Sequence, residues 1–261
     1  MIPKVPVRAA PRHLFEAWPQ VSRRFRSAEH LLLMLDFDGT LAPITAAPRD
    51  ARPVRDVRRI LGRLARRPRT RVYVISGRPL SYLQKKLNVP KVRLLGLHGW
   101  EKPGTVIPAG ERRRFLQAKR WLQQRLLDRP GIELEDKGLG LAVHYGRAFP
   151  QEVSLAREAV LQILWRSNHT MRLMEGRNIW ELLPAFIKGK GATSARLLAQ
   201  LSRRWLPVYT GDDQSDESAF AALRQGVTIH VGGSEDTQAR FWLRDPSEVR
   251  EFLERLEAMT P

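Results

Sequence analysis

The chain has 261 residues, of which 43% are hydrophobic and 28% are charged, and this composition is typical of a folded globular protein rather than a disordered one. It contains no cysteine, which excludes disulfides, thiolate metal sites and cysteine nucleophiles. No apolar run reaches the ~18 residues that a transmembrane helix needs, and no signal-peptide pattern is present. We therefore expect a cytoplasmic protein without a membrane partner.

The net charge is high, at +18, from 45 Lys and Arg residues against 27 Asp and Glu residues. Groups of arginines occur in several segments, so we predict that the positive charge is spread over the molecule: 23–26, 63–71, 112–114 and 203–204. Two interpretations stay open, namely solvated Arg-rich faces and attraction of an anionic substrate or surface. A nucleic acid partner is not expected.

Residues 1–28 contain four prolines among basic residues, and we predict an N-terminal extension that packs late or stays mobile, with a short helix near 13–18. The continuous apolar run at 31–35 then predicts a strand that is buried on both faces of a parallel sheet. Helices and strands alternate after it, at 54–67, 72–75, 80–87 and 92–97. This alternation predicts an open α/β sheet with helices on both faces.

The pattern changes in the middle of the chain. Two helices and four short strands are predicted there, at 112–127, 132–135, 139–145, 152–165, 171–174 and 178–183, which indicates a small α+β unit with a partly antiparallel sheet. The α/β alternation returns with segments at 192–203, 208–210, 217–223, 227–231 and 247–257. We therefore predict one α/β domain interrupted by an insertion, with these boundaries: extension 1–28, core 29–104, inserted domain 105–185 and core 186–261.

Carboxylates follow the first buried strand directly. Asp36 and Asp38 end the apolar run, and Gly39 and Thr40 continue the turn. Ligands of open α/β sheets bind beyond the carboxyl ends of the strands, and two buried carboxylates are costly unless a cation offsets them. The motif therefore predicts a site that holds a cation and a phosphate together. The alternative is that the two Asp residues only cap a turn.

A second acidic cluster follows the predicted strand at 208–210. Its three Asp residues lie within five positions and are typical of an oxygen-ligand site for a hard cation such as Mg²⁺: Asp212, Asp213 and Asp216. The alternative is an N-cap with favourable acids in the first turn of a helix. A hydroxyl at Ser76 and ammonium groups at Lys188 and Lys190 strengthen the metal and phosphate interpretation.

Four segments resemble, in order, the motifs of haloacid-dehalogenase-superfamily phosphatases: Asp36-Phe37-Asp38-Gly39-Thr40, Ser76-Gly77-Arg78, a Lys-Gly pair and Gly211-Asp212-Asp213-x-x-Asp216. Three further segments are similar to those of trehalose-6-phosphate phosphatases: 96–101, 135–145 and 211–217. The resemblance covers about residues 30–255, and it departs from the family pattern at Gly146 and Leu183. It implies a Rossmann-like parallel-sheet core with an inserted α+β cap domain.

The same resemblance implies a mechanism. Asp36 is the expected nucleophile, forming an aspartyl-phosphate, and Asp38 the general acid and base. Mg²⁺ is expected on the Asp36 carboxylate, the Asp38 carbonyl and Asp212. Lys190 is preferred to Lys188 as the phosphate lysine, because its position resembles the start of the family's helix. The other expected phosphate and substrate contacts are Thr40, Ser76, Gly77, Arg78, His98, Glu101, Lys137, His144, Glu181, Asp213 and Asp216.

The function implied is hydrolysis of trehalose 6-phosphate to trehalose and phosphate, with a small-molecule sugar phosphate as the partner of a monomer. The four core motifs do not choose the sugar, so a phosphatase for sucrose phosphate or mannosylglycerate phosphate remains an alternative. A basic protein that binds nucleic acid or an anionic surface on the same fold is a second alternative, although all four motif carboxylates are present. Trp100 and Trp180 are candidates for stacking on a sugar ring or for packing.

Overall fold

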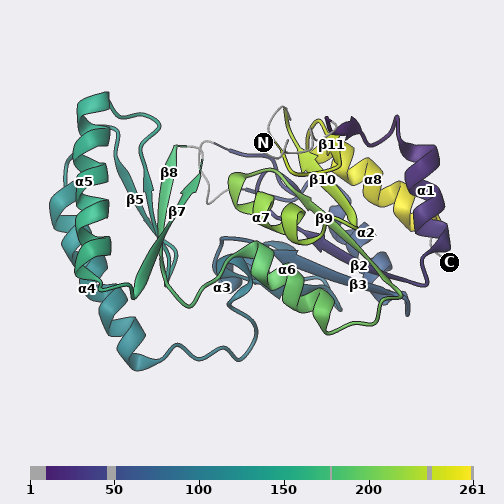
Figure 1. Cartoon of the computed structure of the whole chain (residues 1–261), viewed down its shortest axis with the longest axis horizontal. Coiled ribbons are helices and arrows are strands. Elements are labelled where there is room, and N and C mark those ends of the chain that lie inside the picture. The colour runs from purple at the N-terminus through teal and green to yellow at the C-terminus, as the bar shows by residue number, and fades with distance from the viewer. Residues whose placement is uncertain (1–9, 46–50, 177, 234–236, 260–261) are drawn as a thin grey trace, which may run out of the picture.

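The computed structural model describes residues 10–45, 51–176, 178–233 and 237–259. These residues form two lobes that lie side by side (Figure 1). The larger lobe holds a seven-stranded parallel sheet, with the strands in this spatial order: β1 (Arg12–His13), β11 (Phe241–Leu243), β10 (Val227–Val231), β9 (Trp205–Gly211), β2 (His30–Leu35), β3 (Thr70–Ile75) and β4 (Arg93–Leu95).

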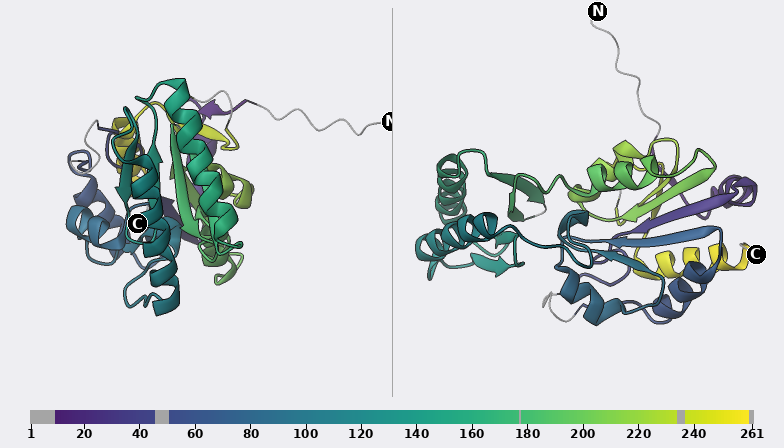
Figure 2. Two further views of the ribbon diagram at one scale, coloured as in Figure 1. Left: turned by 90° about the vertical axis from the view of Figure 1, so that its left-hand side faces the viewer. Right: turned by 90° about the horizontal axis from the view of Figure 1, so that it is seen from below.

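Helices cover both faces of this sheet (Figure 2). One face packs against α1 (Trp18–Ser27), α2 (Val57–Arg66), α3 (Leu80–Leu87) and α8 (Pro246–Met259). The other face packs against α6 (Lys190–Ala199) and α7 (Gln214–Ala222). Side chains of β2 alternate between the two apolar clusters, with Leu33 on the first face and Met34 on the second. The predicted α/β core with a strand buried on both faces is therefore confirmed.

The smaller lobe holds a four-stranded antiparallel sheet in the order β5 (Glu133–Asp136), β6 (Leu141–His144), β8 (Ile179–Pro184) and β7 (Met171–Gly176). Its two helices, α4 (Ala109–Leu126) and α5 (Pro150–Arg166), lie on the side away from the larger lobe (Figure 1). A separate apolar cluster joins the helices to the sheet. The sheet is antiparallel throughout and not only in part, and the inserted α+β cap is confirmed as an element of the fold.

The N-terminal segment was expected to pack late or to stay mobile, and from residue 10 onward it is packed. Although residues 1–9 lie outside the described residues, β1 extends the sheet by pairing with β11, and α1 packs against α8. Val21 and Phe25 of α1 are at most 4% exposed. The helix begins at Trp18, with Pro19 in its first turn, where the missing N–H is tolerated. Pro19 therefore marks the start of a packed helix, and the short helix predicted near 13–18 is wrong, because the helix begins only at Trp18.

Parallel pairing brings the predicted motifs to one edge of the larger sheet. The segments that follow β2, β3 and β9 all leave at the carboxyl edge, which faces the smaller lobe (Figure 1). Every helix in the described ranges is too short or too polar to cross a membrane. The short strand β11 and the 3₁₀ turn at Leu97–Gly99 were not predicted.

Candidate active site

Lys190 lies at the centre of a buried group of charges at the carboxyl edge of the larger sheet. Its Nζ is 2.9 Å from Asp36 Oδ1 and 2.8 Å from Asp216 Oδ1. Lys190, Asp36 and Asp216 are 2%, 4% and 0% exposed, respectively. Lys188 is exposed two residues earlier. The structure therefore brings Lys190, and not Lys188, to the candidate nucleophile.

Burial controls the electrostatics of this group. It raises the pKa of Asp36 to about 7, although the nearby Lys190 lowers it. Burial also raises the pKa of Asp212 well above its ordinary value, and repulsion from Asp36 and Asp216 adds to that effect. Burial alone would lower the pKa of Lys190, but attraction by Asp216 and Asp36 outweighs it and keeps the ammonium charged. Three carboxylates thus lie close together, and one ammonium pairs with two of them.

This imbalance of charge fits a divalent cation. Oxygens of Asp36, Asp212 and Asp216 lie within 4.8 Å of one another. Carboxylate oxygens are the ligands that Mg²⁺ prefers, and a bound cation offsets carboxylates that would otherwise repel each other. Gly39 has a φ of 73°, and a side chain there would overlap the Asp212 carboxylate. The turn after β2 therefore admits Asp212 only because residue 39 is glycine.

Asp216 has contacts that position it within the protein. Tyr209 donates its hydroxyl to Asp216 Oδ1 at 2.7 Å, and the Asp213 N–H donates to Asp216 Oδ2 at 3.1 Å. Asp213 and Asp216 form a capping box at the start of α7. The capping interpretation of the second acidic cluster is therefore confirmed for Asp213 and Asp216, and it is compatible with a metal at Asp212, which stands outside the box.

Two other predicted substrate contacts are also satisfied internally. Thr40 is fully buried, and its hydroxyl donates to Asp212 Oδ1 at 3.4 Å. The Glu101 carboxylate accepts the N–H of Leu80 at 2.6 Å, at the start of α3. In the described part of the chain, the cavity wall includes neither of them, nor Asp216. We therefore propose positioning roles for Thr40, Glu101 and Asp216 in place of substrate contact.

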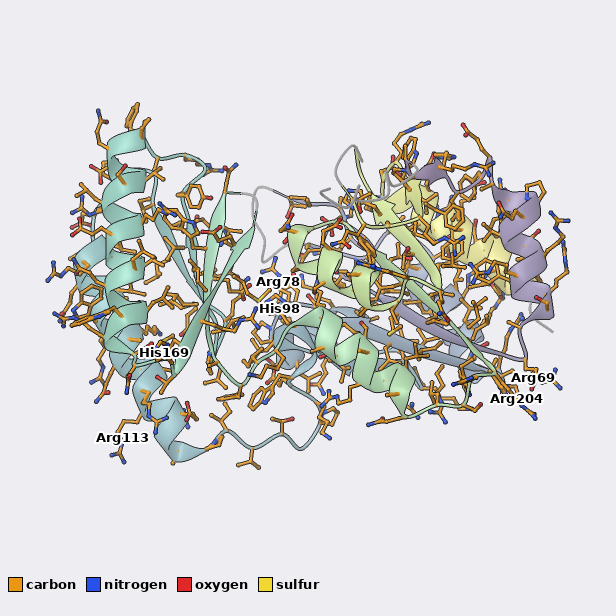
Figure 3. The ribbon with its side chains drawn as sticks, viewed as in Figure 1. Arg69, Arg78, His98, Arg113, His169 and Arg204 are labelled. Carbon is orange, nitrogen blue, oxygen red and sulfur yellow. The ribbon has the colours of Figure 1, made fainter. Side chains whose placement is uncertain are left out.

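Arg78 connects the two lobes (Figure 3). It donates from Nε to Asp38 Oδ2 at 2.7 Å and from Nη2 to Asp38 Oδ1 at 3.1 Å, while Nη1 donates to Glu135 Oε1 of the smaller lobe at 3.0 Å. The other oxygen of Glu135 lies 3.0 Å from His144 Nε2. Burial would raise the pKa of Glu135, but His144, Lys137 and Arg78 together lower it. A chain of charged groups therefore runs from Asp38 into the smaller lobe.

A second connection joins His98 to the smaller lobe. His98 Nε2 lies 2.9 Å from Glu181 Oε2, and Lys137 Nζ lies 3.4 Å from Glu181 Oε1. Burial would raise the pKa of Glu181, but attraction by His98 and Lys137 outweighs it and holds the pKa well below its ordinary value. His98 has a left-handed backbone, with φ 56° and ψ 27°. A side chain at Gly77 would contact the His98 ring, so glycine there makes room for it.

Both connections border one cavity of about 590 Å³ between the lobes. The predicted residues that line it are Asp36, Asp38, Ser76, Gly77, Arg78, His98, Lys137, His144, Glu181, Lys190, Asp212 and Asp213. The cavity is in the size range of small-molecule sites, and its polar wall comes from both lobes. Positive and negative groups therefore surround a space suited to a charged polar ligand.

The cavity also has lining residues that the sequence patterns missed: Glu135, Ile44, Met174, Glu175, Gly176, Asn178, Ile179, Ser215, His230, Val231, Gly232 and Gly233. Glu135 could have been found, because it lies in the predicted strand at 132–135, two positions before the expected substrate residue Lys137. The others follow from the approach of the lobes and had no local signal.

Trp180 stacks on Tyr145 with ring centroids 4.1 Å apart, and Trp100 packs on Phe186, so both tryptophans belong to the packing of the smaller lobe.

A parallel sheet with acidic motifs at its carboxyl edge, opposite an inserted α+β lobe, defines the haloacid-dehalogenase-like class of folds. A family model described as trehalose-phosphatase matches residues 34–247. The chain belongs to the trehalose-phosphatase family.

Named relatives agree with this membership. A trehalose-phosphate phosphatase of Mycobacterium avium is 35% identical over 252 residues, which cover 88% of this chain and 63% of the relative. The chain thus spans less than two thirds of that relative. The Aspergillus fumigatus trehalose-6-phosphate phosphatase structure has a TM-score of 0.68 at 27% identity, covering 96% of this chain and 99% of the other. The C-terminal domain of the Candida albicans enzyme shares the fold, with a TM-score of 0.80, 23% identity and coverage of 96% and 98%.

Proposed function

We propose that the chain hydrolyses trehalose 6-phosphate to trehalose and inorganic phosphate, in the cytoplasm and with Mg²⁺. The observation that carries the proposal is the buried group of Asp36, Lys190 and Asp216, which opens into a polar cavity between two lobes. Membership of the family supports the substrate, because the Mycobacterium avium relative is a trehalose-phosphate phosphatase.

A phosphate monoester resists attack because its own negative charge repels the nucleophile, so catalysis depends on neutralised charge and alignment. In the proposed first step, an oxygen of Asp36 bonds to phosphorus while the bond from phosphorus to the sugar oxygen breaks. Asp38 gives its proton to that oxygen. In the second step, water attacks the aspartyl-phosphate, Asp38 takes the proton of the water, and phosphate leaves with Asp36 regenerated.

The residues around these two carboxylates supply the conditions. Lys190 neutralises charge beside Asp36, and Ser76 lies on the cavity wall where it can donate to a phosphate oxygen. Asp36 and Asp212 would hold Mg²⁺ together with the Asp38 carbonyl, and a bound Mg²⁺ supplies further neutralisation of the phosphate charge. Arg78 donates a hydrogen bond to each oxygen of Asp38. One of these hydrogen bonds must break before that oxygen can carry the proton that Asp38 gives to the sugar.

The smaller lobe would recognise the sugar. Lys137 and Glu181 bring buried charged groups to the cavity, and His144 with Glu135 brings a second polar pair. Sugar hydroxyls both donate and accept hydrogen bonds, so they can replace parts of these pairs as the lobes close and exclude water.

One assay tests the proposal: phosphate release from a panel of sugar phosphates, each with Mg²⁺ and with a chelator, by the wild type and by Asp36→Asn. We expect Mg²⁺-dependent release that is fastest from trehalose 6-phosphate and absent from the variant. Faster release from sucrose 6-phosphate or mannosylglycerate phosphate would overturn the sugar assignment. Equal release by Asp36→Asn would overturn the nucleophile.

A further inference from the structure

The positive charge of the molecule is gathered in one segment. Residues 51–100 contain 14 Lys and Arg residues and a single acidic residue, Asp56, so they carry +13 of the total +18. This segment forms α2, β3, α3 and β4, at one side of the larger lobe (Figure 2). Basic residues occur along the whole chain, as expected, but their excess over acidic residues is concentrated in this one segment.

The centre of this basic side is a groove of about 310 Å³ between α2 and the segment after α3. Its wall consists of four arginines and a glycine from α2, together with three uncharged residues: Arg58, Arg59, Gly62, Arg63, Arg66, Asn88, Val89 and Pro90. Gly62 forms the floor, where an added Cβ would lie 3.3 Å from Val89 Cγ1 and 4.0 Å from Arg66 Nη1. A glycine inside a helix costs about 1 kcal/mol relative to alanine, and here it keeps the groove open.

The arginines of the groove are only partly neutralised. Arg59 Nε lies 3.4 Å from Asp56 Oδ1, and Arg63 Nη1 lies 3.1 Å from Glu257 Oε1. Over the ranges that the structure describes, Arg58 and Arg66 have no ion pair, and both are exposed. The wall itself contributes no carboxylate. A concave site with surplus guanidinium groups attracts anions, and guanidinium binds phosphate with two parallel hydrogen bonds.

We propose that this groove binds a chain of linked phosphates, as found in inorganic polyphosphate and in nucleoside triphosphates. Arg59, Arg63 and Arg66 follow each other at helical spacing, so their attachment points form a row of about 10 Å along α2. A single phosphate cannot span this row, whereas several linked phosphates can contact each guanidinium in turn. The ligand class is therefore set by the number and the linear arrangement of the positive charges.

Other polyanions fit the groove less well. Binding of single-stranded nucleic acid uses aromatic side chains that stack on bases, and the wall of this groove has none. Attachment to an anionic membrane uses exposed apolar side chains, and the large exposed apolar residues of the described chain all lie outside residues 51–100. A nucleic acid duplex is convex and needs a broad surface, so it would meet the rim but not the floor at Gly62.

The test is a titration of metal-free protein with inorganic tripolyphosphate at low salt, followed by calorimetry. The groove variant is Arg58→Gln/Arg66→Gln, and the control is Arg112→Gln/Arg113→Gln, which removes the same charge from exposed positions of α4 in the smaller lobe (Figure 3). We expect the groove variant to lose about ten- to a hundredfold in affinity, the range for one charged hydrogen bond, and the control less than twofold.

Several outcomes would overturn the proposal: no binding by the wild type, an equal loss in both variants, or full binding by the groove variant, which would place tripolyphosphate in the cavity between the lobes. A parallel arm with ATP distinguishes the sources, since equal affinity for ATP would show recognition of the phosphate chain alone. Duplex DNA that binds more tightly than tripolyphosphate, with an equal loss in both variants, would indicate a general basic surface. That result would also overturn the proposal. Trehalose 6-phosphate turnover by the groove variant should equal that of the wild type, so failure of this inference leaves the proposed function standing.

Discussion

The two sides of the cavity are built in different ways. On the larger lobe, Asp36, Lys190 and Asp216 form a group of which each member is at most 4% exposed, and Tyr209 also holds Asp216. Across the cavity, Arg78 of the larger lobe pairs with Glu135 of the smaller lobe, and these two side chains retain 11% and 21% exposure. Breaking a fully buried ion pair leaves a buried charge without a partner. A partly exposed pair at the cavity can instead exchange its hydrogen bonds for bonds to water or to a ligand. The buried group therefore suits a catalytic role that needs fixed geometry, and the partly exposed pair suits recognition of a ligand and closure of the lobes.

The most severe test of this contrast is Asp36→Asn. An amide cannot form the acyl phosphate, so we expect turnover to fall by roughly 10⁴-fold or more, the scale seen when a covalent nucleophile is removed. The fold should survive, because the amide keeps the shape of the carboxyl group. Phosphate release and a thermal melt measure the two effects. Turnover above a small fraction of the wild type would contradict the role of Asp36.

Metal binding should distinguish two adjacent aspartates. Loss of an outer-shell partner typically costs about 10- to 100-fold in metal affinity, so Asp212→Ala, which removes a proposed direct ligand, should cost at least about 100-fold. Asp213→Ala is the matched control, since Asp213 caps α7 and should affect mainly helix stability. The Mg²⁺ concentration for half-maximal activity is the measurement. Equal shifts in the two variants would contradict the assignment, as would full activity in a chelator.

Lys190→Met tests how much the buried group of Asp36, Lys190 and Asp216 contributes to stability. Removal of the ammonium leaves Asp36 and Asp216 buried together, and breaking a buried pair typically costs about 3–5 kcal/mol of unfolding free energy. The control is Lys188→Met, at an exposed position two residues away, which should change stability by less than about 0.5 kcal/mol. Urea denaturation gives both values. Similar stabilities of the two variants would show that the group is not held by Lys190.

Lys137→Ala tests the recognition side. Its ammonium should contribute to turnover only when the sugar is present, so the variant should lose about 10- to 100-fold on trehalose 6-phosphate, the range for one charged hydrogen bond, and little on a small artificial phosphate ester. Lys119→Ala is the control, because its ammonium pairs with Asp136 outside the cavity wall. An equal loss on both substrates would place Lys137 in the phosphate site or in the fold.

The smallest expected effect concerns acid stability. The pKa of Glu181 is lower in the folded protein than its ordinary 4.5, so its ionised form stabilises the fold above that pH, and the stabilisation is lost as pH falls through the folded pKa. The free energy of unfolding of the wild type should exceed that of Glu181→Gln by about 1–3 kcal/mol at pH 7. This difference should shrink below pH 4.5. Denaturation at a series of pH values measures this. The exposed Glu133→Gln should show little pH-dependent difference, and the same result for Glu181→Gln would contradict the buried pair.

Sequence patterns located most elements of the fold but not their edges. Continuous apolar runs identified β2, β3 and β9, because a strand covered on both faces leaves no position for polar residues. The two-residue β1 and three-residue β11 gave no such signal, since they are too short for a pattern and depend on pairing at the edge of the sheet, β1 with β11 and β11 with β10. The same reason explains why the sequence left open whether the segment of α1 packs or stays mobile: its core contacts come from α8, at the other end of the chain.

The sequence by itself determined which chemical groups stand at the ends of the strands, because a buried strand and the turn that follows it are encoded by neighbouring residues. Only the tertiary structure decided which groups meet. It pairs Lys190 with Asp36, sends Arg78 to Glu135 of the inserted lobe, and turns Asp216 inward to a capping role. It also places Asn88, Val89 and Pro90 beside the arginines of α2 to form the groove. Such contacts depend on where distant segments return in space, and that is set by the packing of whole sheets and helices rather than by any local pattern.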